Sequence, residues 1–257
     1  MASTTPYRMI SARVSPMVEL ARWLFERQGL PYREEAHVPM LHVRATLAVN
    51  GGVEVPVIVT PDGQVWKGAR DTLNGLDSVS PPGKRLFGED EAERAANQAF
   101  LETLLTLLLA NVRRYVYHEV LPYRNLLYAT ATHRAPAWQR AFVWFLYPVW
   151  RGMMARGLGF SPEELAEAPV RIEEALSLVE AELARRGTPF LGGATPGVLD
   201  IVFSALSGPL VFPRNYGARL PPFDELPAAL KAFVKATRAR PAGDLVLRTY
   251  AAARAYR

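Results

Sequence analysis

The sequence of 257 residues contains no cysteine. This absence excludes disulfide bonds, thiolate metal sites and a cysteine nucleophile. The four histidines, at positions 37, 42, 118 and 133, do not have the spacing of metal ligands. We therefore expect no metal site.

Long apolar runs and a signal peptide are also missing. The longest apolar stretch, residues 138–154, is interrupted by Arg140 and Arg151, and a membrane span needs roughly 18 uninterrupted residues. Residues 1–5 lack the charged start and apolar core of a signal peptide. These absences predict a cytoplasmic protein with no membrane partner.

The chain carries a net charge of +5, from 30 Lys plus Arg and 25 Asp plus Glu. Nearly all the cations are arginines, and they are spread along the chain without a basic run. The pattern gives no reason to expect a nucleic-acid partner. An anionic small ligand would still be attracted to the surface.

The first 78 residues alternate between strand and helix patterns. Ser15-Pro16 opens a helix, because Ser is a preferred N-cap and Pro fits the first helical position. Pro61-Asp62-Gly63 is a strong turn signal inside a hairpin. The predicted order is a strand at 7–11, a helix from 16 to a stop at Gly29, a strand at 32–38, an irregular or helical segment at 41–50, hairpin strands at 55–59 and 64–67, and a helix at 69–78.

Ser80-Pro81-Pro82-Gly83-Lys84 has the composition of a linker. Every long segment after it has helical character, with apolar residues at three- and four-residue spacing. We predict domains at 1–79 and 89–257, joined by residues 80–88. The predicted helices of the second domain cover 89–117, 137–156, 162–186, 196–210, 226–237 and 241–254, and that at 196–210 is apolar enough to be buried at the centre.

Three segments together resemble the cytosolic glutathione transferases over nearly the whole chain. They are Ser15-Pro16 before a helix, Val55-Pro56-Val57-Ile58 before a hairpin, and Phe190-Leu191-Gly192-Gly193 leading to Asp200. The resemblance implies an α+β thioredoxin-like N-terminal domain followed by an all-α C-terminal domain. It also implies glutathione as co-substrate, a small-molecule substrate and a homodimer.

The resemblance assigns roles to individual residues. Ser15 would be the catalytic residue that stabilises the glutathione thiolate, and the alternative from local sequence is that it only caps its helix. Pro56 would be cis, so that the backbone of Val55 meets the cysteinyl unit of glutathione. The absence of cysteine excludes the members that form a mixed disulfide with glutathione.

One position departs from the family pattern. The family usually has Glu-Ser or Asp-Ser at the start of the third helix, where they hold the γ-glutamyl end of glutathione; this chain has Gly68-Ala69. Only backbone N–H groups there can bind a carboxylate, with Lys67 or Arg70 as possible added charges. The resemblance as a whole implies an enzyme that conjugates glutathione to a small apolar electrophile. The alternative is a non-catalytic member that binds apolar ligands or a protein partner.

Two further features have more than one interpretation. The aromatic residues between 138 and 150 fit a core, a pocket for an apolar co-substrate, or a surface for a partner or membrane. Asp200 is expected to be structural, with Thr195-Pro196 as the start of its helix. Tyr7, Tyr115 and Tyr117 are further candidates for the pocket.

Overall fold

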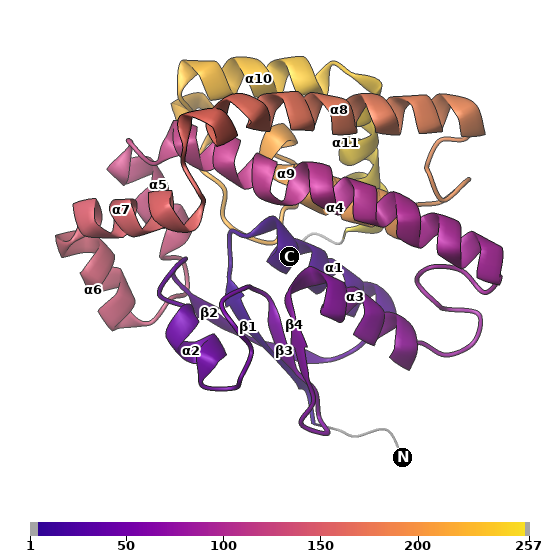
Figure 1. The fold of residues 1–257 in the computed structure, drawn as a ribbon, viewed down its shortest axis with the longest axis horizontal. Helices are drawn as coiled ribbons and strands as arrows, with labels where there is room; N and C mark the ends of the chain where they lie inside the picture. Colours follow the sequence, from indigo (N-terminus) through magenta and orange to yellow (C-terminus); the bar gives the residue numbers. More distant parts are fainter. Residues whose placement is uncertain (1–4, 255–257) are drawn as a thin grey trace.

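A four-stranded sheet organises the first part of the chain in the computed structural model, which describes residues 5–254. Strand β1 (Tyr7–Ala12) runs parallel to β2 (Tyr32–His37) and antiparallel to β3 (Val57–Val59), and β3 forms a hairpin with β4 (Val65–Lys67). Helices α1 (Pro16–Gln28) and α3 (Gly68–Val79) pack against each other next to the sheet, apart from the short α2 (Val43–Leu47) (Figure 1). The arrangement is thioredoxin-like.

Helix α1 begins and ends where its sequence signals predict. Ser15 is its N-cap, Pro16 its first residue, and Gly29 closes it with a left-handed φ of 66° that a glycine adopts at low cost. The predicted apolar stripe is buried, with Met17, Leu20 and Leu24 each at most 3% exposed. This packing fixes the start of α1 relative to the sheet.

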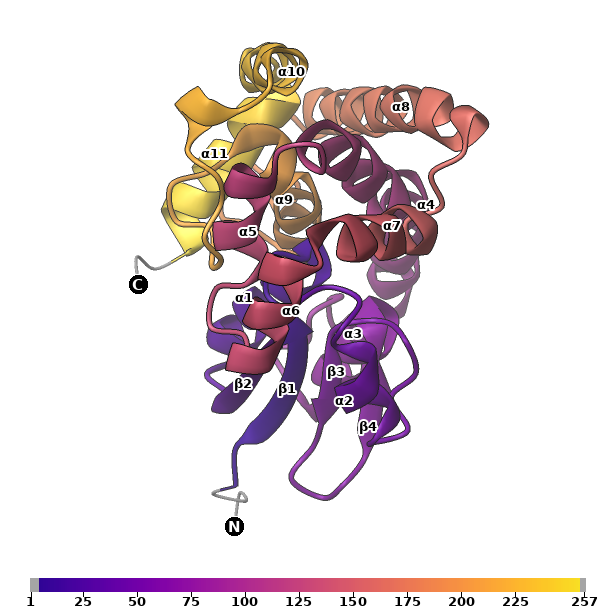
Figure 2. The same cartoon turned by 90° about the vertical axis from the view of Figure 1, so that its left-hand side faces the viewer.

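The second part of the chain is helical and covers one side of the thioredoxin-like part (Figures 1 and 2). Every residue of the central helix α9 is buried, and this helix contacts α1, α4 and α11. It therefore connects the two parts through apolar packing. The helices are α4 (Glu91–Val120), α5 (Arg124–Ala131), α6 (Ala137–Phe145), α7 (Tyr147–Gly157), α8 (Pro162–Arg186), α9 (Val198–Val211), α10 (Ala228–Arg238) and α11 (Pro241–Ala253), with a 3₁₀ turn η1 (Phe223–Glu225).

Helix α4 is long and apolar enough, by length and composition alone, to span a membrane. Its residues Leu104, Leu105 and Leu108 are, however, almost fully buried, and the helix packs along α8 and α9. Side chains that already have protein partners are not available to lipid, so α4 is a helix of the protein core.

Asp200 near the start of α9 is structural, as predicted. Its carboxylate is fully buried and accepts hydrogen bonds from the backbone N–H groups of Leu191, Gly192 and Gly197 at 2.7–2.8 Å. The expectation that Thr195-Pro196 starts the helix was wrong. Gly197 is the N-cap, because its own N–H pairs with the Asp200 carboxylate.

Two other expectations need correction. The single helix predicted over 137–156 is two helices, because the backbone breaks at Leu146, with φ −116° and ψ 35°. Pro148 then lies in the first turn of α7, where its missing N–H is tolerated. The sequence interpretation also left out α5, a helix of eight residues.

Candidate functional site

The sheet register brings the predicted site segments to one end of the sheet. Val57, the first residue of β3, pairs with Ile10 near the end of β1 and with Lys67 at the end of β4. The loop before α1, the Val55-Pro56 segment and the start of α3 therefore all lie at the same end of the sheet. The Gly68 N–H also donates to the Pro56 carbonyl at 2.8 Å.

Ser15 lies at the N-terminus of α1 but does not cap it with its side chain. Its carbonyl accepts from the N–H groups of Val18 and Glu19, whereas its hydroxyl makes no capping bond. The Oγ is buried and has no hydrogen-bond partner within residues 5–254, although the residue is 7% exposed. A buried polar atom without a partner is unusual in a folded protein and requires an explanation.

The peptide bond between Val55 and Pro56 is cis, as the resemblance implies. Gly68 begins α3 with a left-handed φ of 69°, and Ala69 follows as a buried residue. The first turn of a helix leaves backbone N–H groups without intrahelical acceptors, so this end of α3 can bind an anion. Neither side chain adds a polar group.

A carboxylate from another segment occupies the space beside Gly68. A Cβ atom placed on Gly68 would lie 2.7 Å from Oε2 of Glu54, the residue just before Val55. Glu54 is exposed to solvent. The sequence interpretation missed this residue, and the available signal was its position two residues before a proline expected to be cis.

Lys67, one of the two cations predicted for this end of the site, is exposed, and two arginines nearby differ in their availability. Arg70 forms an exposed ion pair with Glu102 at 2.8 Å. Arg113 of α4 has no ion pair within the described residues; its Nε donates to the Leu109 carbonyl, and Glu54 lies close enough to act on it electrostatically. Burial lowers the pKa of Arg113, an effect that the Glu54 charge opposes.

A small apolar cavity lies between α1, α4 and the segment after α9. It has a volume of about 40 Å³. Val14 and Pro16, the neighbours of Ser15, line it together with Arg113 and Tyr117. Burial raises the pKa of Tyr117, so its hydroxyl is protonated at neutral pH. Tyr7 and Tyr115 pack against other aromatic rings instead, Tyr7 against Phe25 and Trp66, and Tyr115 against Phe233.

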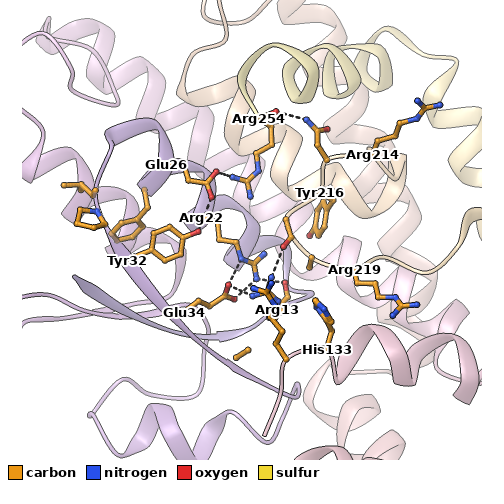
Figure 3. A pocket seen from close by; sticks show the side chains of 18 of the residues that line it. Arg13, Arg22, Glu26, Tyr32, Glu34, His133, Arg214, Tyr216, Arg219 and Arg254 are labelled. Carbon is orange, nitrogen blue, oxygen red and sulfur yellow. Dashed lines mark hydrogen bonds and ion pairs between the residues drawn. The ribbon is translucent and has the colours of Figure 1, made fainter. Parts of the chain in front are cut away.

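A larger cleft of about 960 Å³ opens between β2, α1 and the loop after α9 (Figure 3). Its floor is an ionic network. Glu34 accepts from Arg13 at 2.6 Å and from Arg22 at 2.7 Å. Burial alone would raise the pKa of Glu34, but these two arginines outweigh it and hold that pKa below its ordinary value.

The same network joins the two parts of the chain. Glu19 of α1 is fully buried; it pairs with Arg22 and Arg254 and accepts from the backbone N–H of Gly217 at 3.0 Å. In Figure 3 the side chains of Arg214 and Arg219 on the rim point away from this floor. The deep charges thus neutralise one another, and the floor acts as an ionic clamp between α1 and the C-terminal segments.

No group of three or more His, Asp or Glu side chains within residues 5–254 is arranged to hold a metal ion. What the site segments offer is a buried hydroxyl at a helix N-terminus, backbone groups beside a cis proline, and a carboxylate beside Gly68. These groups suit a small peptide that carries a thiol, an amine and carboxylates.

Residues 9–82 match the family model of the glutathione S-transferase N-terminal domain. Solved structures resemble the whole chain at low sequence identity. Glutathione transferase GSTFuA3 from Phanerochaete chrysosporium has a TM-score of 0.56 and 19% identity, covering 79% of this chain and 84% of that one. A glutathione S-transferase from Methylobacterium radiotolerans, in complex with glutathione sulfonate, has a TM-score of 0.54 and 18% identity, covering 98% of this chain and 97% of that one. A third structure, a glutathione S-transferase from Methylobacillus flagellatus with glutathione bound, has a TM-score of 0.53 and 13% identity, covering 93% of this chain and 98% of that one.

No curated protein sequence matches this chain significantly. The structural likenesses, all below 25% identity, establish the fold, and the family model covers the N-terminal domain. Residues 9–82 thus match the glutathione S-transferase N-terminal domain, and the chain as a whole has the fold of the glutathione transferases.

Proposed function

We propose that this protein is a glutathione S-transferase-like enzyme that attaches glutathione to a small apolar electrophile, with Ser15 as the catalytic residue. The observation that carries the proposal is the buried Ser15 hydroxyl, which has no partner in the described structure and does not cap its helix. The hydroxyl is suited to donate a hydrogen bond to a sulfur anion placed at the start of α1.

The proposed chemistry needs a thiolate at neutral pH. A free thiol has a pKa of about 8.5, and a helix N-terminus lowers such a pKa because its backbone N–H groups favour negative charge. In the proposed step the glutathione sulfur bonds to an electrophilic carbon, and the leaving group departs with the bonding electrons. The Ser15 hydroxyl donates to the sulfur and does not change its own bonds.

Glutathione would lie at the end of the sheet where the predicted site segments meet. The backbone of Val55 would pair with the cysteinyl unit. At the Gly68-Ala69 start of α3, the N–H of Ala69 would donate to the γ-glutamyl carboxylate, because the Gly68 N–H already donates to the Pro56 carbonyl. Glu54 would bind the γ-glutamyl amine, in place of the acidic side chain that the family usually has at the start of this helix. Arg113 is available for a carboxylate because it lacks an ion pair within the described residues.

The electrophile would enter beside Pro16 and Tyr117. Most of the cavity lining there is aliphatic or aromatic, which favours an apolar molecule. Its volume of about 40 Å³ is small, so the bound molecule must be small or must displace side chains.

The test is conjugation of an aryl halide, measured with wild type, Ser15→Ala and the matched control Ser177→Ala on the exposed face of α8. A hydrogen bond to a charged group contributes about 1.5–3 kcal/mol, so Ser15→Ala should lower kcat/KM by about 10- to 100-fold and the control should not. Wild-type activity no faster than the uncatalysed reaction would rule out this substrate class.

The second candidate is a non-catalytic member that binds apolar ligands or a protein partner. The lack of a polar side chain at Gly68-Ala69 favours it. Calorimetry separates the two, because a non-catalytic binder should give no heat with millimolar glutathione. Homodimer formation and a cytoplasmic location remain part of the proposal, and light scattering tests the first.

A further inference from the structure

The corner between α6 and α7 exposes a cluster of large apolar side chains. Of the eleven large hydrophobic residues that the described structure exposes, five lie between residues 138 and 149. Phe145 is the most exposed of all at 78%, and Val149 is 54% exposed. This corner lies at one end of the molecule (Figure 1) and faces the viewer in Figure 2. The five are Trp138, Trp144, Phe145, Leu146 and Val149.

The opposite face of the two helices holds this corner firmly to the body of the protein. Gln139 accepts from the backbone N–H of Val38 at 2.7 Å. The ring N–H of the fully buried Trp150 donates to the Pro39 carbonyl at 2.9 Å, and Tyr147 donates to the Leu121 carbonyl at 2.7 Å. The apolar outer face is therefore a stable feature of the surface, since the inner face already has its own partners.

The stretch of chain that contains this corner carries formal charges of one sign only. Residues 121–161 contain five arginines and no Asp or Glu, so the other 25 basic residues of the chain are balanced by its 25 acidic ones. The stretch thus accounts for the whole net charge of +5. No carboxylate within residues 5–254 forms an ion pair with any of the five, which are Arg124, Arg134, Arg140, Arg151 and Arg156.

Two of the five arginines lie next to the exposed Trp144 ring. Arg140 lies one helical turn before Trp144, so the two share a face of α6. The Arg124 guanidinium lies 4.5 Å from the centre of the Trp144 ring. Aromatic and apolar side chains beside unpaired arginines are the composition of helices that lie in the interface of a membrane.

We propose that the α6–α7 corner binds the surface of a bilayer that contains anionic phospholipids. Phe145, Leu146 and Val149 enter the boundary between headgroups and acyl chains, where removing apolar area from water is favourable. Trp138 and Trp144 lie at the level of the headgroups, as amphipathic rings do. This inference departs from the sequence-based expectation of no membrane partner, and it does not depend on glutathione binding.

A second copy of the chain is a less suitable occupant. A twofold interface places the same patch of both copies face to face, so it would bring the unpaired arginines of one copy against those of the other. Anionic phospholipids instead supply the charge that this stretch lacks, because each arginine near such a surface is attracted to it.

The experiment is co-sedimentation of the full-length protein with vesicles of phosphatidylcholine, with and without phosphatidylglycerol, at low and high salt. We expect binding to the anionic vesicles only, weaker at high salt. Tryptophan emission should shift to shorter wavelength, because Trp138 and Trp144 are about half exposed whereas Trp23, Trp66 and Trp150 are at most 9% exposed.

Two double variants separate the two contributions. Phe145→Ser with Val149→Ser should lower vesicle affinity by about tenfold or more, from lost apolar burial. Arg140→Gln with Arg151→Gln should lower it by a similar factor of about ten and weaken the salt dependence. The matched control is Val170→Ser with Arg44→Gln, both exposed residues on other helices, and it should bind as wild type does.

Three results would overturn the proposal. The first is no binding to anionic vesicles at low salt, and the second is equal binding by the corner variants and the control. The third is a dimer in light scattering that Phe145→Ser with Val149→Ser converts to monomer, which would show that a second copy covers this face. Unchanged circular dichroism in all variants establishes that they are folded.

Discussion

Replacing Glu54 by Gln tests whether a carboxylate from outside α3 holds the γ-glutamyl end of glutathione. The substitution keeps the size of the side chain and removes its charge, beside Gly68 where the structure places Oε2. An interaction between a charged amine and a carboxylate contributes about 1.5–3 kcal/mol when shielded and about 0.2–1 kcal/mol when exposed. Because Glu54 is exposed, we expect a loss near 1 kcal/mol, which is about a fivefold rise in Kd.

The assay is calorimetry of wild type, Glu54→Gln and the matched control Glu225→Gln, an exposed residue of η1 that makes the same change in net charge. Each protein is titrated with glutathione and with glutathione acetylated on its γ-glutamyl amine. Wild type should discriminate between the two ligands, and Glu54→Gln should do so about fivefold less. Equal discrimination by Glu54→Gln and Glu225→Gln would refute the role of this carboxylate.

Three further predictions concern stability. Glu19→Ala leaves Arg254 and the Gly217 N–H without that buried carboxylate, so chemical denaturation should show a loss of about 3–5 kcal/mol; a loss below about 1 kcal/mol would contradict the ionic clamp. Burial lowers the pKa of His42 below its unfolded value of about 6.5, so stability should be full above that pH and fall as the pH drops through it; His42→Asn should remove this pH dependence, and an unchanged profile would be the negative result. Trp150→Ala should cost about 3–5 kcal/mol in the same assay, because the fully buried ring fills the core beneath α7, and a near-neutral effect would mean that this core rearranges.

The sequence predicted those parts of the fold that depend on local patterns. Ser15-Pro16 and Gly29 delimit α1, the Pro61-Asp62-Gly63 turn joins β3 to β4, and the 162–186 helix has the predicted bounds. These features arise from capping, turn chemistry and periodicity within a few residues of chain. The domain boundary at 80–88 remains a prediction.

The features that the sequence did not predict depend on contacts between distant segments. The position of Glu54 beside Gly68 requires the hairpin and α3 to be in place. The break at Leu146 is different, because Pro148 was a local signal for it that the sequence interpretation did not use. Trp150 is consequently buried while Trp144 remains about half exposed, although the two are only six residues apart.

The structure also changes the interpretation of Ser15. From local sequence, a serine before a proline is simply a helix cap, and that alternative stood beside the catalytic one. The absence of a side-chain capping bond removes that explanation for the hydroxyl. Its burial without a partner in the described residues is what makes the catalytic proposal the better account.

The most direct test of the central claim is a crystal structure of the protein soaked with glutathione. The account predicts the glutathione sulfur within about 3.5 Å of the Ser15 Oγ, with the cysteinyl backbone paired to Val55 and the γ-glutamyl amine at Glu54. Two results would contradict it. Glutathione at millimolar concentration could be absent from this end of the sheet, or it could bind with its sulfur away from Ser15.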